Sequence, residues 1–441
     1  MTQTILKFDI ASTDERLTSH SGEIVFGEYL KAIRLDKLCD RYLPQPKSNR
    51  GFAPFSFIQP LLLMLHGGGH SLDDLRMIQD DMAMREVLNI KHVPTADATG
   101  KWMKRHGLIG VYGVESINKA LLKRYLKRVD EPLILDIDAS VIESHKSIAD
   151  YTYKKFPGFT PMIGHINGGY VIHSEFRSGN IAPADHNLSF VQRCQTQLPQ
   201  SKKITYLRAD AASYQSSLFD YCQANDITYT IGAPLDSAIL HNINEIETWK
   251  PLRDHEGKTH HVKEEVAEFI HTMQHTKHAF RLIVTKKTTT PILPELEGLL
   301  SQEELLSYAS ERYHVIATNM DDETMSLQDI VKFYRQRGDT SENRIKELKN
   351  GFNLKYLPTS DFMANALYFS IGVLAYNLFV LFKETLTSSW RKHTIQTLRY
   401  KLYNIAGKVI THARKTILKV NKQFIDILQA IRQKSYEISL E

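Results

Sequence analysis

Two strand-like runs that each end in an aspartate are the strongest constraint on the fold of this chain. Residues 132–138 read PLILDID, an alternating pattern that places Asp136 and Asp138 on the same face of a strand. A second run, residues 207–210 (LRAD), ends at Asp210 and is followed by a helix-like segment. Functional sites of α/β sheets gather at the carboxyl ends of strands. The sequence therefore predicts an α/β fold with an acidic site at one sheet edge.

A third carboxylate lies in residues 334–349, which read YRQRGDTSENRIKELK. Strong helix formers follow Glu342, so this glutamate is predicted near a helix N-terminus, with Lys346 and Lys349 on the same face. The charge pattern alone favours an ordinary salt-bridged surface helix. Three carboxylates on separate elements favour instead a two-metal site for phosphoryl transfer.

The order Tyr334, Arg337, Glu342, Lys349 resembles the YREK motif of bacterial insertion-sequence DDE transposases. Within these, the chain is most similar to the insertion-sequence-four superfamily and its insertion-sequence-1380 group. One departure is the spacing before the glutamate. The family usually has three residues between the arginine and the glutamate, whereas this chain has four, residues 338–341.

The resemblance implies that Asp138, Asp210 and Glu342 are catalytic and hold two Mg²⁺ ions, for which Mn²⁺ substitutes. Asp138-Ala139-Ser140 fits the family pattern of aspartate, any residue, then Thr or Ser. Asp136 is then a supporting neighbour or a strand-edge cap. For Asp210, the alternative role is an N-cap carboxylate at the following helix.

DNA contacts are also implied by the resemblance. Tyr334, Arg337 and Lys349 are expected to bind phosphates around the scissile bond, and Lys346 is a further DNA-binding candidate. Trp249 is a candidate for stacking on a flipped base, with a hydrophobic plug as the alternative.

The resemblance predicts an RNase-H-like catalytic core interrupted by a β-rich insertion. Asp210 and Glu342 are 132 residues apart, too far for one strand and one helix, and strand-like runs occupy 278–284 and 313–318. The predicted regions are a helical N-terminal DNA-binding region (1–130), the first part of the core (131–235), the insertion (236–325), the second part of the core (326–388) and a basic helical C-terminal region (389–441).

The two outer regions carry the remaining basic segments. Short helices over residues 71–106 suit either a helix-turn-helix-like DNA reader or a plain helical domain with a solvated basic face. Amphipathic spacing predicts one helix over 26–43 and another over 410–431. Residues 391–434 contain a single acid, Asp426, so this tail is expected to contact phosphates or to form a solvated face.

Composition sets broad limits on the class of protein. The 441 residues are 42% hydrophobic with a net charge of +5, typical of a folded protein that tolerates nucleic acid without requiring it. Three well-separated cysteines match no metal spacing and read as reduced thiols. The N-terminus lacks a signal-peptide layout, and the apolar run 364–382 is interpreted as a buried core helix, not a membrane span.

The expected function is therefore a DDE transposase that binds the ends of its own insertion sequence and cuts and joins DNA, with hairpin ends implied by the resemblance. Expected partners are double-stranded transposon-end and target DNA and a second copy in a homodimer, with no membrane. The expected location is the bacterial cytoplasm, associated with the nucleoid. Alternatives are an RNase-H-like nuclease without strand transfer and a domesticated DNA-binding protein that has lost catalysis.

Overall fold

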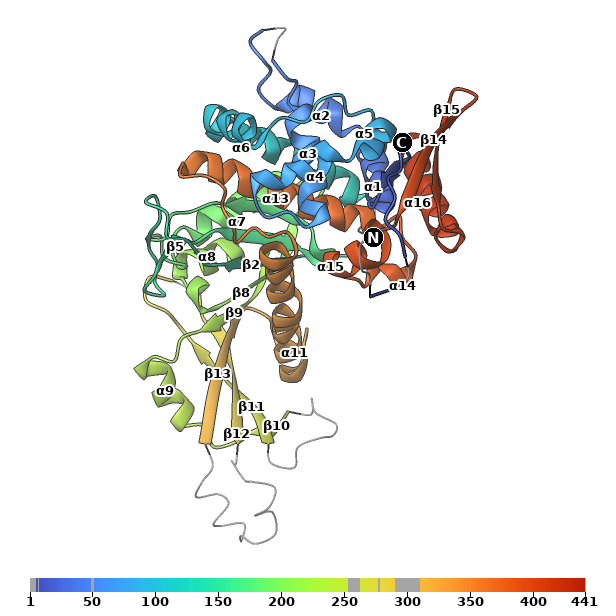
Figure 1. The fold of residues 1–441 in the computed structure, drawn as a ribbon. Coiled ribbons are helices and arrows are strands. Elements are labelled where there is room, and N and C mark those ends of the chain that lie inside the picture. The colour runs from blue at the N-terminus through green and yellow to red at the C-terminus, as the bar shows by residue number, and fades with distance from the viewer. Residues whose placement is uncertain are drawn as a thin grey trace. The chain divides into compact units, whose positions relative to one another are not determined.

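The chain forms two compact units, Met1–Ile117 with Glu347–Glu441, and Asn118–Lys346. Each is described by itself. The computed structural model (Figure 1) describes residues 5–6, 8–48, 51–127, 129, 131–252, 262–276, 278–289 and 310–440, without the side chains of residues 262, 263, 339 and 340. The five regions proposed from the sequence remain a prediction.

A nine-stranded sheet organises the unit Asn118–Lys346. Its order is β10-β11-β12-β13-β9-β8-β2-β6-β7. Strand β8 runs parallel to both β2 and β9, and all other neighbours are antiparallel. The strands are β2 (Leu133–Ala139), β6 (Met162–Ile166), β7 (Val171–Glu175), β8 (Ile204–Ala209), β9 (Thr228–Ala233), β10 (Lys250–Pro251), β11 (Val262–His271), β12 (Phe280–Thr289) and β13 (Ser310–Thr318).

Helices α7 (Asn187–Gln197) and α11 (Leu327–Arg337) cover opposite faces of this sheet. On one face, a Cβ on Gly164 would lie 2.8 Å from Cys194 Sγ and 3.0 Å from Phe190, so α7 packs directly on the backbone of β6. On the other face, the ring of Tyr206 lies 5.5 Å from that of Phe333 in α11. Because side chains alternate along β2, Asp136 and Asp138 share the face covered by α11.

The strand-like runs predicted between Asp210 and Glu342 are confirmed as parts of β12 and β13. They do not form a separate sheet, because β13 pairs with β9 from Val315–Ala233 to Thr318–Thr230 and so extends the same sheet. Helix α11 packs on this extension through Ile330 and Val331. Strand β6 lies in a segment that the sequence analysis did not read as a strand.

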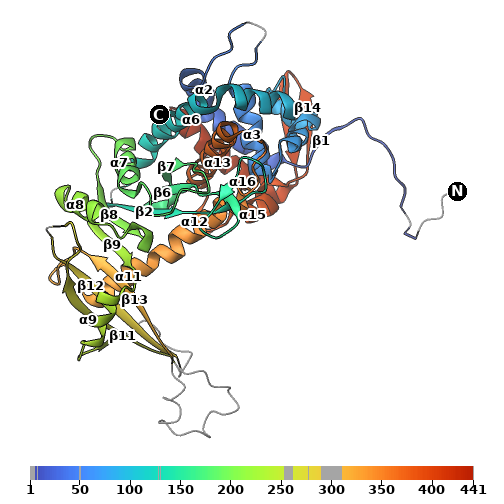
Figure 2. The same ribbon diagram turned by 90° about the vertical axis from the view of Figure 1, so that its left-hand side faces the viewer.

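The remaining elements of this unit are short. Figure 2 shows β2, β6 and β7 side by side, and helices α7 and α8 contact each other. The elements are β3 (Ile142–Glu143), β4 (Asp150–Tyr151), β5 (Pro157–Phe159), η2 (Asn167–Gly169), η3 (Ala211–Ser213), α8 (Ser216–Ala224), α9 (Ser237–Asn244), the π-helix η5 (Gly338–Glu342) and α12 (Asn343–Lys346).

The other unit is mainly helical and has one small sheet of order β1-β14-β15. Its elements are β1 (Arg16–Thr18), α1 (Ser21–Ala32), α2 (Leu35–Tyr42), α3 (Phe55–Gly67), η1 (Leu72–Leu75), α4 (Arg76–Asp80), α5 (Met82–Leu88), the first part of α6 (Ala96–Leu126), η6 (Glu347–Gly351), α13 (Phe362–Lys383), α14 (Ser388–Arg391), α15 (Ile395–Leu398), η7 (Arg399–Tyr403), β14 (Gly407–His412), β15 (Lys415–Val420), η8 (Lys422–Phe424) and α16 (Ile425–Leu440).

Helix α13 is the core helix of this unit, as predicted. It is long and apolar enough to cross a membrane, but 89% of its most apolar window is buried inside the protein and it packs against α3. Within the helix, Asn365 is fully buried and its side chain bonds the backbone of Thr359 in both directions, at 3.0 Å and 2.9 Å. A satisfied buried amide is expected in a protein core.

Two helices predicted from apolar spacing are wrong in part. The helix predicted over 26–43 is split into α1 and α2, because Arg34 adopts a left-handed conformation with φ of 57°. The helix predicted over 410–431 is a hairpin, β14 and β15, followed by α16. Two left-handed residues, Ala413 and Arg414, form a tight hairpin turn between β-branched runs. The C-terminal region is therefore not wholly helical.

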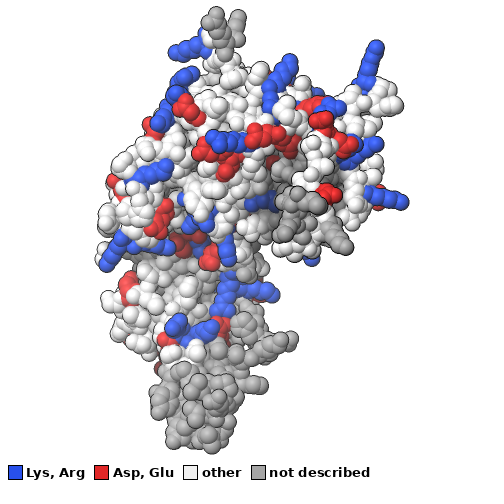
Figure 3. Space-filling view, viewed as in Figure 1, with Lys and Arg blue, Asp and Glu red and all other residues white. Residues whose placement is uncertain are grey.

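Several cations of the basic tail are engaged inside their own unit. Arg399 donates to the carbonyls of Leu65, His66 and Gly351. Arg432 pairs with Glu28, and Lys408 pairs with Glu15. On the face shown in Figure 3, Lys and Arg lie among Asp and Glu over the coloured surface instead of gathering into one basic patch. These contacts reduce the positive charge that the tail presents to phosphates.

Candidate active site at the carboxyl ends of β2 and β8

Asp136 is locked inside the sheet by Arg208 of the neighbouring strand β8. The Arg208 guanidinium donates to both carboxylate oxygens, at 2.6 Å and 2.8 Å, and its third nitrogen donates to the carbonyl of Phe333 in α11 at 2.8 Å. The side chains of Asp136 and Arg208 are 1% and 5% exposed. Such a bidentate buried pair holds β2, β8 and α11 together. Asp136 is therefore a structural carboxylate.

Asp138, two residues further along β2, lies near the end of the strand and is partly exposed. Its side chain is 18% exposed and pairs with Arg337 at 3.4 Å. This distance is longer than that of a strong charge-assisted hydrogen bond. Asp138 is thus held loosely, in contrast to Asp136.

Asp210 lies level with Asp138 on the adjacent strand. In the parallel pairing of β2 with β8, Asp136 is opposite Arg208, so two further residues along each chain bring Asp138 beside Asp210. Asp210 also caps the short helix η3, because its carboxylate accepts from the amide of Ala212 at 3.1 Å. The capping role considered from the sequence is therefore present, and it uses one of the two carboxylate oxygens.

Glu342 is the last residue of the π-helix η5, and its side chain is exposed. Residues five apart are turned about 140° from each other on an α-helix. A π-turn instead closes over five residues and brings them back towards one side. The extra residue between Arg337 and Glu342 is therefore taken up by a wider turn, so that the arginine and the glutamate return to a common side.

Asp210 and Glu342 act electrostatically on Asp138. The pKa of Asp138 is raised to about 6: burial is the main cause, Arg337 opposes it, and the charges of Asp210 and Glu342 add to it. Burial likewise raises the pKa of Tyr334, with contributions from Asp210, Asp138 and Glu342. A site that concentrates negative charge in this way disfavours full ionisation until a cation is bound.

Tyr334 lies directly over the end of the sheet. A Cβ added to Gly232 of β9 would be 2.9 Å from the Tyr334 hydroxyl and 3.0 Å from the amide of Ala211. Glycine is therefore required for the tyrosine to reach the chain beside Asp210. The ring of Tyr334 also contacts His314, with ring centres 5.2 Å apart.

Arg337 is turned inward. It is 7% exposed, and one terminal nitrogen lies 3.4 Å from both an Asp138 oxygen and the carbonyl of Ile137. This placement differs from an exposed, phosphate-binding guanidinium. In this arrangement Arg337 holds the end of β2 and partly neutralises Asp138.

The other candidate residues are spread over the two units. Lys346 is exposed on α12, while Lys349 is half-buried on η6 in the other unit. Trp249 lies near β10, where the Lys286 ammonium is 4.4 Å from its ring centre and Tyr313 is 6.2 Å away. These contacts cover part of the Trp249 ring and fit the hydrophobic-plug alternative at least as well as base stacking.

A divalent cation suits the chemistry of these donors. Among the residues that the structure describes, no three His, Cys, Asp or Glu side chains converge closely enough to hold one metal ion. Asp138, Asp210 and Glu342 nevertheless supply hard oxygen donors, which Mg²⁺ and Mn²⁺ prefer. Because the charges of Asp210 and Glu342 raise the pKa of Asp138, a bound cation would favour the ionised form of Asp138.

Two residues of this site were not predicted from the sequence. Tyr153, in the loop between β4 and β5, is 53% exposed, and Asp138 and Asp210 add to the effect of burial in raising its pKa. Sequence periodicity could not have found Tyr153, because a loop residue gives no periodic signal of its position. Arg208 was visible in LRAD, yet its pairing with Asp136 across 72 residues has no local signature.

These features define a class of protein, a mixed α/β chain with an acidic site where two parallel strands end. The profile of the family described as Transposase DDE domain group 1 matches residues 6–433, so the chain belongs to this family and is a DDE transposase. Members act on DNA and generally use divalent metal ions. No curated protein matches the sequence.

Proposed function

We propose that this transposase binds the inverted-repeat ends of its own insertion sequence and catalyses metal-dependent cleavage and strand transfer. One observation carries the proposal, namely the parallel pairing of β2 and β8, which brings Asp138 level with Asp210. Glu342 completes the set, since its charge also acts on Asp138. Three coupled carboxylates on separate elements are what phosphoryl transfer on DNA requires.

The proposed architecture is an RNase-H-like core with an insertion. The strand order β7-β6-β2-β8-β9, antiparallel on one side of β2 and parallel on the other, supports the core. In the sequence, strands β10 to β13 lie between β9 and α11, which supports the proposed insertion. The helical N-terminal region is the proposed DNA reader, and the insertion-sequence-four superfamily, with its 1380-type group, is the proposed subgroup.

The proposed cofactor is Mg²⁺, with Mn²⁺ as a substitute, held by Asp138, Asp210 and Glu342. When bound, the metal would activate the attacking water or hydroxyl and neutralise charge on the phosphate. Arg337 holds Asp138 at the end of β2. Tyr334 projects its hydroxyl towards Asp210, where it would bind a phosphate oxygen beside the scissile bond.

The remaining proposed contacts concern the DNA on either side of that bond. Lys346 and Lys349 would bind backbone phosphates. Trp249 would stack on a displaced base, which requires Lys286 to leave the face of its ring. The proposed reaction proceeds through hairpin ends within a homodimer on paired ends, in the bacterial cytoplasm at the nucleoid.

The test is a cleavage and strand-transfer assay with purified protein, DNA carrying the flanking ends, and Mg²⁺. Nicks, hairpins and joined products that disappear in Glu342→Gln would support the whole proposal. The matched control is Glu323→Gln, an exposed glutamate in the loop before α11. Cleavage without joining would identify a nuclease, and binding without cleavage in Mg²⁺ or Mn²⁺ would identify a DNA-binding protein that has lost catalysis.

A further inference from the structure

The segment before β1 presents apolar side chains to solvent in a strand-like pattern. Leu6, Phe8 and Ile10 alternate along the chain and are 67%, 62% and 92% exposed. Alternating apolar residues are the signature of a strand with one buried face. Figure 2 shows the chain running away from β1 towards the N-terminus. The amide of Phe8 donates to the carbonyl of Leu6 at 3.0 Å, a local bond that strand pairing would replace.

A free strand edge lies in the same unit. The three-stranded sheet has the order β1-β14-β15, so among the described strands β15 pairs on one side only. Ile417 on β15 is 38% exposed. Unpaired edges of this kind readily accept an additional strand from another chain.

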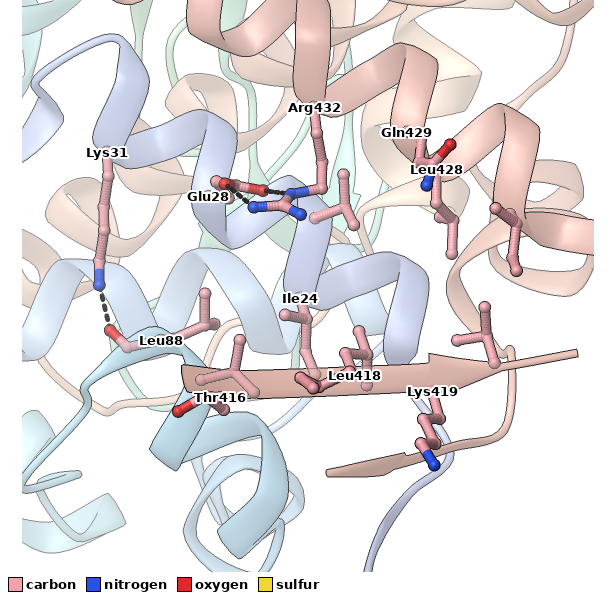
Figure 4. Close-up of a pocket in the computed structure, with 15 residues that line it drawn as sticks. Ile24, Glu28, Lys31, Leu88, Thr416, Leu418, Lys419, Leu428, Gln429 and Arg432 are labelled. Atoms are coloured by element: carbon pink, nitrogen blue, oxygen red, sulfur yellow. Dashed lines mark hydrogen bonds and ion pairs between the residues drawn. The ribbon is translucent and has the colours of Figure 1, made fainter. Parts of the chain in front are cut away.

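An apolar cavity of about 840 Å³ runs along that edge. Consecutive residues from Thr416 to Val420 line the cavity. Because side chains alternate between the two faces of a strand, lining by consecutive residues indicates that the cavity follows the strand edge. Figure 4 shows Ile24 of α1, Leu418 of β15 and Leu428 of α16 around this space. The cavity therefore combines apolar side chains with the backbone of β15, which among the described strands has a partner on one side only.

The charged side chains of α1 and α16 that line the cavity are already paired. Arg432 donates to both oxygens of Glu28, at 2.6 Å and 2.9 Å, and Lys31 donates to the carbonyl of Leu88. On the strand itself, Lys415 and Lys419 are exposed. An occupant should therefore offer apolar side chains on one face and an acidic group on the other.

We propose that the segment Leu6–Ile10 of one copy adds as a fourth strand to the β15 edge of a second copy. Leu6, Phe8 and Ile10 then enter the cavity, and Asp9, on the opposite face, lies near the two edge lysines. Strand addition supplies affinity through backbone hydrogen bonds and specificity through pockets for alternate side chains. Each copy carries both the segment and the edge, so a two-fold exchange fills two cavities at once.

The residues that follow the segment, Glu15 and Arg16, are held at the opposite edge of the sheet from β15. Glu15 pairs with Lys408, and Arg16 pairs with Glu86 and donates to Thr411 at 3.2 Å. Strand β14 lies between these residues and β15. To reach β15 of its own copy, the segment would have to cross β14, whereas a partner's edge requires no such crossing. The inference deepens the homodimer of the proposed function and rests on it for the identity of the partner.

Disulfide trapping between copies tests the proposal without DNA or metal. The native cysteines Cys39, Cys194 and Cys222 are buried, so introduced thiols react selectively. Ile10→Cys protein is mixed with a larger, tagged Leu418→Cys protein under mild oxidation, since both residues lie on the cavity face. A disulfide that joins the untagged chain to the larger, tagged chain is expected. Pairing only within a doubly substituted chain, or no disulfide, would overturn the proposal.

Sedimentation equilibrium provides the second measurement. Phe8→Asp is expected to raise the dimer dissociation constant by at least about tenfold, because a buried aromatic anchor is lost. Ile270→Asp, an equally exposed apolar residue on β11, should leave it unchanged. Equal dissociation constants for wild type and Phe8→Asp would overturn the proposal. Because neither assay involves catalysis, failure here and failure of the cleavage assay are separate results.

Discussion

Two aspartates on one face of one strand have opposite environments. Asp136, inside β2, is 1% exposed and has both oxygens bound by Arg208. Asp138, at the end of β2, is 18% exposed, lies 3.4 Å from Arg337 and has its pKa raised to about 6. The difference shows how one strand can supply both stability and chemistry. A carboxylate bound on both oxygens inside the sheet is structural, and one held less tightly at the strand end would be available to a cation.

The largest expected effect is on catalysis at the end of the strand. Asp138→Asn should lower DNA cleavage by about 10³-fold or more, because it removes a charge needed only when phosphoryl transfer occurs. Binding of transposon-end DNA, measured by gel shift, should not change. Loss of both activities would mean that Asp138 shapes the protein, and the contrast with Asp136 would disappear.

The next effect is on stability inside the strand. Asp136→Ala should reduce the free energy of unfolding by about 3 kcal/mol, because Arg208 is left buried without its partner charge. Urea denaturation of the purified protein measures this. The double variant Asp136→Leu, Arg208→Met should recover much of the loss, since it removes both charges. If Asp136→Ala is as stable as wild type, the pair does not hold β2 to β8.

Substitution of Asp138 is expected to have a smaller effect on the free energy of unfolding, and of opposite sign to that of Asp136→Ala. A carboxyl whose pKa is raised in the folded state stabilises the fold at low pH, and this contribution is lost as pH rises through about 6. Above that pH, ionised Asp138 destabilises the metal-free protein. Asp138→Asn should therefore unfold at higher urea at pH 8, by about 1–2 kcal/mol, with no gain at pH 4.

The control for this experiment is Asp322→Asn, an exposed aspartate in the loop before α11. It should show no such dependence on pH. Addition of Mg²⁺ should stabilise wild type and leave Asp138→Asn unaffected, because a ligand stabilises only the protein that binds it. A stability gain for Asp138→Asn that is equal at pH 4 and pH 8 would contradict the assigned cause.

The smallest effect concerns Arg337. Its charge lowers the pKa of Asp138, so Arg337→Gln should raise that pKa further. The acidic limb of the cleavage pH profile should then move upward by about half to one pH unit. Arg335→Gln is the matched control, because Arg335 pairs with Glu264 at 3.0 Å instead. A loss of activity without any shift would indicate that Arg337 acts on the DNA, as the sequence motif suggests.

Much of the core was predictable because its signals are local. Alternation in PLILDID located β2, and the strand-like runs 278–284 and 313–318 fall largely on β12 and β13. The tail was predicted less well. Its apolar spacing fitted both a helix and a hairpin, and the left-handed pair Ala413 and Arg414 decided between them.

The sequence by itself determined strand β2, the face that carries Asp136 and Asp138, and the family motif that contains Glu342 and Lys349. Only the tertiary structure decided which aspartate is held and which is open. The reason is that Arg208, Phe333 and Arg337 reach β2 from distant parts of the chain. Periodicity reports which way a side chain points, whereas its charge environment depends on which neighbours the fold brings to it.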